Sequence, residues 1–358
     1  MGVGRHGGLD LIAYRLDRSF SWNASHPPKL PPRPRKLPTG PGIRLFDRRV
    51  ENAIGIAAGP LPSSRWIEAY ARLGYGLLTY KTVRTSARPA HIQPNLVFCQ
   101  GGDPAVTEAA PRPLDPANVT WASSFGLPSA DPEEWRADVL RAKSKIRPGQ
   151  LLIVSVVGTP APGGDQQHLA EDYARCAKWA ADAGADVVEL HLSSVSMLGE
   201  QPQMVYENPA LSAYIVDHVR RSVGQRPLIA KLGATRSPRA LHELASRLAP
   251  RLDGFILVNG LKRPVVKKDG TPAFSGESRA DGLVVGAAVY SQCQVQVEEL
   301  LAWRKAGAWN RAILAVGGLT TAARVRDALA SGADAAMVAT AALVDPLIAA
   351  RFLTGKGK

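Results

Sequence analysis

The sequence predicts a closed barrel of eight parallel strands with an outer layer of helices, a (β/α)8 TIM barrel. Apolar runs rich in β-branched residues alternate with amphipathic helical stretches eight times between residues 51 and 358, and these patterns are typical of buried strands and surface helices. Two junctions are near repeats, since Gly184 and Gly332 each follow a helical stretch and precede an apolar run. Eight such units in register favour a barrel over an open sheet.

The apolar runs and the amphipathic stretches define the expected elements in order. The predicted strands span residues 53–58, 76–82, 151–157, 186–192, 228–232, 254–258, 312–316 and 335–339. The predicted helices span residues 64–73, 132–146, 166–183, 208–223, 238–248, 289–306, 321–331 and 345–353. Two long insertions, residues 85–130 and 261–286, follow the second and sixth strands, so we expect both on the C-terminal face, where barrel insertions form lids and pocket walls.

The first 50 residues differ from the rest of the chain. They carry ten basic and three acidic residues, which is more than half of the net charge of +13. Seven prolines between residues 27 and 41 exclude a helix there, and only residues 11–20 have the pattern of a short amphipathic helix. We expect a basic, proline-rich arm (residues 1–50) that packs over the barrel domain (residues 51–358) or over a neighbouring subunit; membrane association is the alternative.

Composition also argues against several classes of protein. The three cysteines are too far apart for a disulfide framework or an iron–sulfur motif, and this fits a reducing, cytoplasmic setting. No apolar run approaches 18 residues, so no transmembrane segment is expected. No metal-ligand spacing and no RNA- or DNA-binding motif is found, so neither a metal nor a nucleic acid is expected as a partner.

Two glycines and a threonine mark an expected anion site. Gly317 and Gly318 follow the seventh predicted strand, and Ala339 and Thr340 end the eighth. Paired glycines let backbone N–H groups approach an anion, and barrels often bind phosphate after these two strands. The alternative interpretation is an ordinary turn into a helix.

Two lysines close apolar strands. Lys231 ends the fifth predicted strand and Lys81 lies near the end of the second. A buried ammonium is costly unless it meets an anion or a strong acceptor, although a lysine can also extend its amine to the solvent. Two lysines at one barrel mouth suit an electron-rich cofactor ring, because a cation near a flavin stabilises its reduced anion.

Six motifs in this order resemble the dihydroorotate dehydrogenase family over about residues 50–355. They are residues 52–59 (NAIGIAAG), 79–82 (TYKT), 123–128 (SSFGLP), 189–194 (ELHLSS), 253–259 (DGFILVN) and 316–318 (VGG). The resemblance implies an FMN-binding barrel, commonly a dimer, that oxidises a C–C bond beside a carbonyl. By position it implies that the flavin ring would contact Ala57, Ala58, Gly59, Lys81 and Lys231. The ribityl phosphate would be held by Gly286, Gly317, Gly318, Ala339 and Thr340.

The same resemblance places the catalytic base and the substrate clamp. Ser194 falls at the position of the loop cysteine or serine that takes a proton while a hydride moves to flavin N5. Four asparagines bind orotate in the family, and the corresponding residues here are Ser123, His191, Ser196 and Asn259. Each amide hydrogen bond lost at a buried site costs about 1 kcal/mol or more, so three losses would weaken orotate binding strongly.

His191 departs most clearly from the family pattern. Side chains alternate along a strand, so His191 shares a face with Glu189 and Ser193, and Glu189 is a candidate partner of Lys231. A histidine there is suited to hydrogen-bond the substrate, or to supply the basicity that Ser194 lacks. The alternative is a histidine whose hydrogen bonds are satisfied beside the ring.

The sequence therefore predicts an FMN-dependent oxidoreductase with Ser194, His191 and Lys81 as catalytic residues. Its expected substrate is a small polar molecule other than dihydroorotate, oxidised at a C–C or C–N bond beside a carbonyl. Two alternatives stay open: a genuine dihydroorotate dehydrogenase with a divergent or water-mediated clamp, and a flavin-binding barrel without turnover. The chain carries no signature of NAD binding, which leaves a free acceptor or a partner protein as the electron acceptor.

Overall fold

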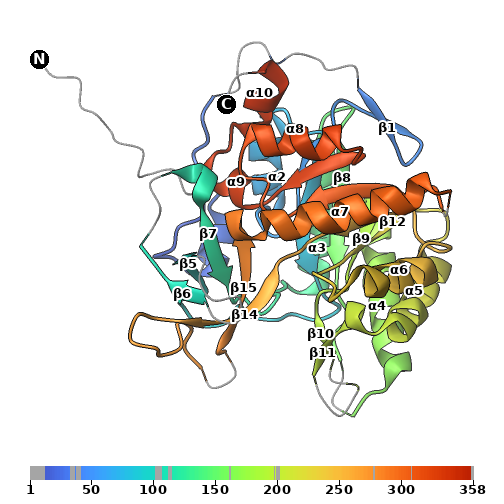
Figure 1. Ribbon diagram of the computed structural model, residues 1–358, viewed down its shortest axis with the longest axis horizontal. Coiled ribbons are helices and arrows are strands. Elements are labelled where there is room, and N and C mark those ends of the chain that lie inside the picture. The colour runs from blue at the N-terminus through green and yellow to red at the C-terminus, as the bar shows by residue number, and fades with distance from the viewer. Residues whose placement is uncertain are drawn as a thin grey trace, which may run out of the picture.

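The fold is that of a computed structural model of the 358-residue chain (Figure 1). It describes residues 13–32, 37, 42–100, 107–111, 115–160, 163–196, 198, 202–276, 279–307 and 309–355. The first twelve residues and most of the proline-rich part of the arm lie outside these ranges.

Eight parallel strands close into a barrel, as the sequence predicts. In chain order they are β3 (Ile54–Ile56), β4 (Leu77–Val83), β8 (Leu151–Val156), β9 (Val187–His191), β12 (Leu228–Lys231), β13 (Gly254–Leu257), β16 (Ala312–Val316) and β17 (Ala335–Val338). Each pairs with its sequence neighbour among these eight, and β17 pairs with β3 to complete the ring. Every predicted strand is therefore confirmed, although most are one or two residues shorter than predicted.

Helices surround this barrel in Figure 1. They are α2 (Ser64–Ala71), α3 (Pro132–Lys145), α4 (Gln166–Asp182), α5 (Pro209–Val223), α6 (Pro238–Leu248), α7 (Tyr290–Lys305), α8 (Ala322–Ala330), α9 (Thr340–Val344) and α10 (Ile348–Thr354). The helix predicted over residues 345–353 is wrong at its start, since Asp345, Pro346 and Leu347 separate α9 from α10. Pro346 explains the break, because proline disfavours helical geometry in the residue before it.

Three aspartates join neighbouring strands at the N-terminal end of the barrel. Asp186, Asp253 and Asp334 directly precede β9, β13 and β17, respectively. Each carboxylate accepts the first or second backbone N–H of the preceding barrel strand: Leu152 at 2.9 Å, Leu228 at 2.8 Å and Ile313 at 2.7 Å. Each also binds a cation, and Asp186 binds two of them, Lys143 of α3 and Arg48.

A short hairpin closes the same end of the barrel. Its strands β1 (Ile43–Leu45) and β2 (Arg48–Val50) are antiparallel. Leu45 and Val50 are buried against a cluster of inward-facing barrel side chains that includes Leu77, Ile153 and Val187. This end is therefore filled by apolar packing, and the polar inward side chains lie toward the other end.

The two insertions form a second, smaller sheet on the C-terminal face. Its strands are β5 (Leu96–Gln100), β6 (Thr107–Ala109) and β7 (Thr120–Ser123) from the first insertion, and β14 (Leu261–Val266) and β15 (Asp281–Gly286) from the second. They close in the order β14-β15-β7-β5-β6 and enclose a core of their own. The sequence predicts where the insertions lie, but not that they pair with each other.

The described part of the arm packs against the barrel domain. The helix predicted over residues 11–20 is wrong over residues 13–19, which form turns, and α1 spans Phe20–Ser25 instead. Ser19 sets this start, because its hydroxyl accepts the N–H of Trp22 at 3.1 Å. Carbonyls of α1 accept bonds from α2 and the residue before it, among them Trp66 Nε1 to Asn23 O at 2.8 Å. In the described ranges, no helix has the length and hydropathy to cross a membrane.

We expect Asp186→Ala to lower the free energy of unfolding by about 3 kcal/mol, because it leaves two cations and the buried Leu152 N–H without their acceptor. Urea unfolding measures this loss. Glu68→Ala, which removes an exposed partner of Lys145, is the control and should cost less than about 1 kcal/mol. Equal effects of the two substitutions would show that Asp186 has no special role in closing the barrel.

Candidate active site

Polar side chains gather toward the C-terminal ends of three neighbouring strands, β8, β9 and β12. The register pairs Ser155 with Glu189, and one layer further toward the C-terminal end it pairs His191 with Lys231. Because side chains alternate along a strand, Glu189 and His191 face the same way as Val187, which belongs to the barrel's inner cluster. The inner face of β9 thus changes from apolar to polar within four residues.

Lys231 and Glu189 are both fully enclosed, and neither has a hydrogen-bond partner among the described residues. The two Glu189 oxygens are buried and unpaired, and no ion pair of 4 Å or less joins them to Lys231. Burial lowers the pKa of Lys231, and the charge of Glu189 acts in the opposite direction. The predicted contact between the two is therefore absent, and Glu189 acts on Lys231 only through its charge.

His191 is a neutral histidine with an unused ring nitrogen. Its side chain is 5% exposed, and Nδ1 has no partner among the described residues. Burial, followed by the charges of Lys231, Arg84 and Lys81, lowers the pKa of His191 to about 3. The ring is therefore a poor base near neutral pH.

Ser194 contacts a tyrosine rather than the His191 ring. Tyr173 of α4 donates a hydrogen bond to the His191 backbone oxygen at 3.0 Å, and its hydroxyl lies 3.0 Å from Ser194 Oγ. Ser194 lies three residues after the end of β9 and directly before β10 (Val195–Ser196), which pairs with β11 (Gln203–Met204). The sequence did not indicate Tyr173; the available signal was a polar-tipped side chain on the apolar face of a helix.

The other predicted clamp residues have different surroundings. Ser123 Oγ donates to Leu283 O at 3.4 Å within the small sheet, and Ser196 Oγ accepts Leu198 N–H at 3.3 Å. Asn259 lies two residues after the end of β13. Its side-chain Nδ2 is buried and has no hydrogen-bond partner in the described ranges. The two serines are thus hydrogen-bonded to their own chain, and only Asn259 keeps a free amide.

Lys81 differs from Lys231 in that its amine is occupied. It donates to the carbonyls of Thr82 and Pro128, and it lies 5.7 Å from the ring centre of Phe20 of the arm. Burial and the charge of Arg84 lower the pKa of Lys81 to about 7. Arg84, which the sequence analysis missed, lies three residues further along and binds Leu127 O at 3.0 Å and Thr159 Oγ1 at 2.9 Å.

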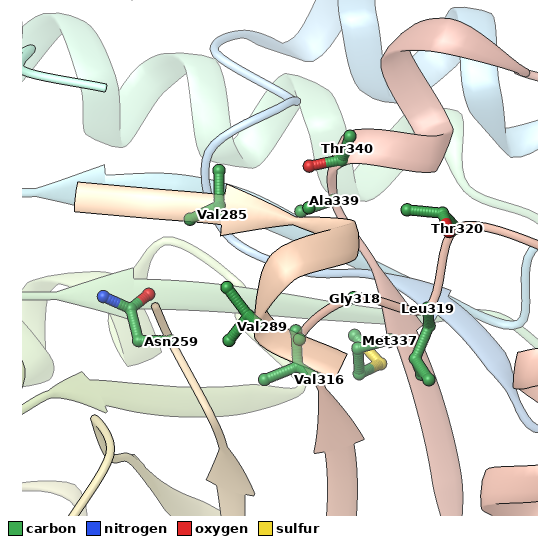
Figure 2. Close-up of a pocket in the computed structure, with 12 residues that line it drawn as sticks. Asn259, Val285, Val289, Val316, Gly318, Leu319, Thr320, Met337, Ala339 and Thr340 are labelled. Atoms are coloured by element: carbon green, nitrogen blue, oxygen red, sulfur yellow. The ribbon is translucent and has the colours of Figure 1, made fainter. Parts of the chain in front are cut away.

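A cavity lies where the seventh and eighth barrel strands end (Figure 2). It is lined by Asn259, Val285, Gly286, Val289, Val316, Gly317, Gly318, Leu319, Thr320, Met337, Ala339 and Thr340. Six of the predicted site residues thus meet in one place. Figure 2 shows Gly318 on one loop and Ala339 and Thr340 at the start of a helix, with Val285 and Val289 beside them.

The glycine turn beside this cavity exposes backbone donors. Gly317 and Gly318 have φ of 121° and 70°, which residues with a side chain rarely adopt. Among the described residues, no acceptor is bound by the N–H groups of Gly317, Gly318, Ala339 or Thr340. Such a group of free N–H donors next to a helix start favours an anion.

Two further polar residues at this cavity escaped the sequence analysis. Thr320 donates to Ala117 O at 2.7 Å, and Arg324 of α8 donates to Thr320 Oγ1 at 2.9 Å and to Gly318 O at 3.0 Å. Arg324 therefore steadies the glycine turn and places a positive charge near it. Its position in the first turn of the helix that follows the glycine pair was the available signal. No cluster of three or more metal-binding side chains occurs in the described residues.

Free N–H donors after the last two strands are typical of barrels that bind a phosphate group. No family model matches the chain. It is 29% identical over 327 residues to the dihydroorotate dehydrogenase of Dictyostelium discoideum, covering 87% of this chain and 86% of the relative. It is 30% identical over 306 residues to the dihydroorotate dehydrogenase (quinone) of Pseudarthrobacter chlorophenolicus, covering 83% and 80%.

The chain belongs to the dihydroorotate dehydrogenase family, which confirms the resemblance inferred from the motifs. It is accordingly an oxidoreductase that acts on CH–CH bonds. Members of the family are flavoproteins, and FMN is their usual cofactor.

His191 should make the protein less stable in mild acid. In the unfolded chain its imidazole takes up a proton near pH 6.5, whereas in the folded protein it does so only near pH 3. The unfolded state thus binds more protons between these values, and the free energy of unfolding falls by roughly 1.4 kcal/mol per pH unit below 6.5.

Urea unfolding at pH 7 and pH 5 measures this effect in the wild type and in His191→Asn, which cannot titrate. The wild type should lose about 2 kcal/mol more than the variant between the two pH values. An identical loss in both proteins would mean that His191 is protonated when folded.

Proposed function

We propose that this protein is an FMN-dependent oxidoreductase whose substrate is a small polar molecule other than dihydroorotate, oxidised at a C–C or C–N bond beside a carbonyl. The proposal combines two features of the chain. The residues expected to hold the flavin have unused binding groups, and the residues expected to hold orotate are largely replaced.

The residues of the site suit FMN. The free N–H groups at Gly317, Gly318, Ala339 and Thr340, with Arg324 nearby, suit the ribityl phosphate. The unpaired ammonium of Lys231 suits the electron-rich part of a flavin ring. Ala57, Ala58 and Gly59, which directly follow β3, complete the proposed flavin contacts with Lys81 and Gly286.

The state of the substrate clamp is the observation that carries the choice of substrate. Of the four positions, Ser123 and Ser196 are hydrogen-bonded to their own backbone, and His191 presents a neutral ring nitrogen. Only Asn259 offers a free amide. A buried site binds a substrate poorly when it lacks groups to match the substrate's polar atoms, so this site selects a different pattern of donors and acceptors.

In the proposed reaction the chain's own residues bind the substrate and manage one proton. FMN supplies the redox chemistry, because it accepts a hydride when it is bound. Ser194 gives up its hydroxyl proton to water, and its Oγ takes the proton from the carbon next to the substrate carbonyl. The His191 ring and the Asn259 amide orient the substrate by hydrogen bonds. Lys231 adds a positive charge that favours the reduced cofactor.

His191 does not supply the basicity of Ser194 in this proposal. Its ring is neutral near pH 7, and the contact of Ser194 is with Tyr173 and with the His191 backbone oxygen. In the same proposal, the reduced flavin passes its electrons to a free acceptor or to a partner protein. The proposed active form is a cytoplasmic homodimer.

Oxidation of dihydroorotate itself is the second candidate function. Both relatives carry the name dihydroorotate dehydrogenase, and their alignments cover most of this chain. In this case Ser123, His191 and Ser196 would bind the same ring, in part through water.

Rapid mixing of the yellow, FMN-loaded protein with candidate substrates separates the two functions. We expect dihydroorotate to bleach the flavin at least roughly 100-fold more slowly than the best of a panel of cyclic amides, since three lost hydrogen bonds cost about 3 kcal/mol. Dihydroorotate as the fastest reductant would establish the second candidate. A flavin that no compound reduces would instead identify a binding barrel without turnover.

Gly318→Ala should deprive the purified protein of its flavin. An added Cβ would lie 2.6 Å from the Tyr290 backbone and displace the turn that holds the free N–H groups. Gly270→Ala is the matched control, because its φ of 82° is equally unsuited to alanine but its Cβ meets nothing within 4 Å. Flavin absorbance per protein should fall by roughly tenfold in the first variant only; equal occupancy would remove the turn from the cofactor site.

A further inference from the structure

The hydroxyl of Tyr173 stands between two oxygens of the candidate active site. It lies 3.0 Å from the His191 backbone oxygen, to which it donates, and 3.0 Å from Ser194 Oγ. Ser194 Oγ is itself 3.5 Å from the same backbone oxygen. Three oxygens from α4, from the end of β9 and from the loop after it thus form one closed triangle.

The tyrosine ring is held firmly in this position. Tyr173 is fully buried, and an added Cβ at Gly158 would lie 2.4 Å from its ring. Packing of the ring needs no hydroxyl, and a buried hydroxyl is costly unless it is hydrogen-bonded. The position of the hydroxyl is therefore explained by its hydrogen bonds to the His191 backbone oxygen and to Ser194 Oγ.

A serine accepts a proton effectively only as its alkoxide, which is scarcely populated near neutral pH unless a neighbouring group stabilises the negative charge. The His191 ring does not contact Ser194, and Lys81 donates to main-chain carbonyls. Among the described residues, Tyr173 is the side chain that hydrogen-bonds to Ser194 Oγ.

We propose that Tyr173 is a positioning residue for Ser194, whose hydroxyl turns from the His191 backbone oxygen to Ser194 Oγ when negative charge develops there. This inference rests on the proposed role of Ser194 as the base. Because both acceptors lie at the same distance, the change requires only a rotation of the O–H bond and no movement of the chain. Hydrogen bonds from fixed donors to a developing anion are among the strongest stabilising effects in active sites.

The surroundings keep this donor in its protonated form. Burial raises the pKa of Tyr173 to about 12, against which the bond to Ser194 and the positive charge of Arg84 act. The charged and titratable groups around it are Arg84 after β4, Cys176 on its own helix and the neutral His191 of β9. Tyr173 is thus a donor throughout the neutral range.

A thiol in place of the Ser194 hydroxyl reports directly on how strongly Tyr173 stabilises negative charge at this position, because that stabilisation lowers the pKa of the thiol. In the FMN-loaded Ser194→Cys protein, the pKa of the introduced thiol is obtained from the pH dependence of its alkylation by iodoacetamide. The native Cys99, Cys176 and Cys293 are buried, and burial raises the pKa of each. The wild-type protein gives their background rate.

We expect the introduced thiol to have a pKa below its ordinary value of about 8.5, and Tyr173→Phe in the same protein to raise it by about one unit. Tyr70→Phe is the matched control, since it removes another buried hydroxyl that donates to a single carbonyl, that of Ala342, at 2.7 Å. It should leave the thiol pKa unchanged. If Tyr173→Phe does not fold, Tyr173→Met removes the same hydroxyl and serves in its place.

A thiol pKa at or above about 8.5, or one that Tyr173→Phe shifts no more than Tyr70→Phe does, overturns the role of Tyr173. The titration needs no substrate, so it remains readable if no cyclic amide reduces the flavin. That result would defeat the proposed function alone, whereas an unshifted thiol would defeat this inference and leave the proposed function standing.

Discussion

When eight parallel strands close into a barrel, every second side chain of each strand points into the barrel interior. Water reaches this interior only from the two ends. At the N-terminal end this space is filled by apolar side chains and closed by the β1–β2 hairpin. Toward the C-terminal end it holds Glu189, His191 and Lys231, each 5% exposed or less. Loss of hydration is therefore the largest cause of the lowered pKa of His191 and of Lys231.

The consequence is a site in which two buried charged groups lack hydrogen-bond partners among the described residues. They are Glu189, whose two oxygens have no donor, and Lys231, whose ammonium has no acceptor. The His191 ring is neutral because burial and three neighbouring cations oppose its protonation. Buried polar groups are usually hydrogen-bonded, so such unpaired groups in one place indicate that a ligand completes them. This is the physical reason for placing a cofactor and a substrate at this end of the barrel.

The Asp186, Asp253 and Asp334 contacts explain how a stable frame tolerates such a site. They connect neighbouring strands at the opposite end, where each carboxylate has backbone and cationic partners. Stability and function are thus separated along the barrel axis, as is general for this architecture. The small sheet from the two insertions then brings Ser123 and Gly286 over the open end, on paired strands.

The sequence by itself determined the eight strands, the place of the insertions and the position of Lys231, His191, Ser194 and the glycine pair at strand ends. It could do so because strand alternation and turn chemistry depend on residues close together in the chain. Only the tertiary structure decided that Ser123 and Ser196 bond to their own backbone, that Lys81 is held by carbonyls and that Tyr173 contacts Ser194. These contacts join elements far apart in sequence, and their geometry depends on how helices and loops pack against the closed barrel.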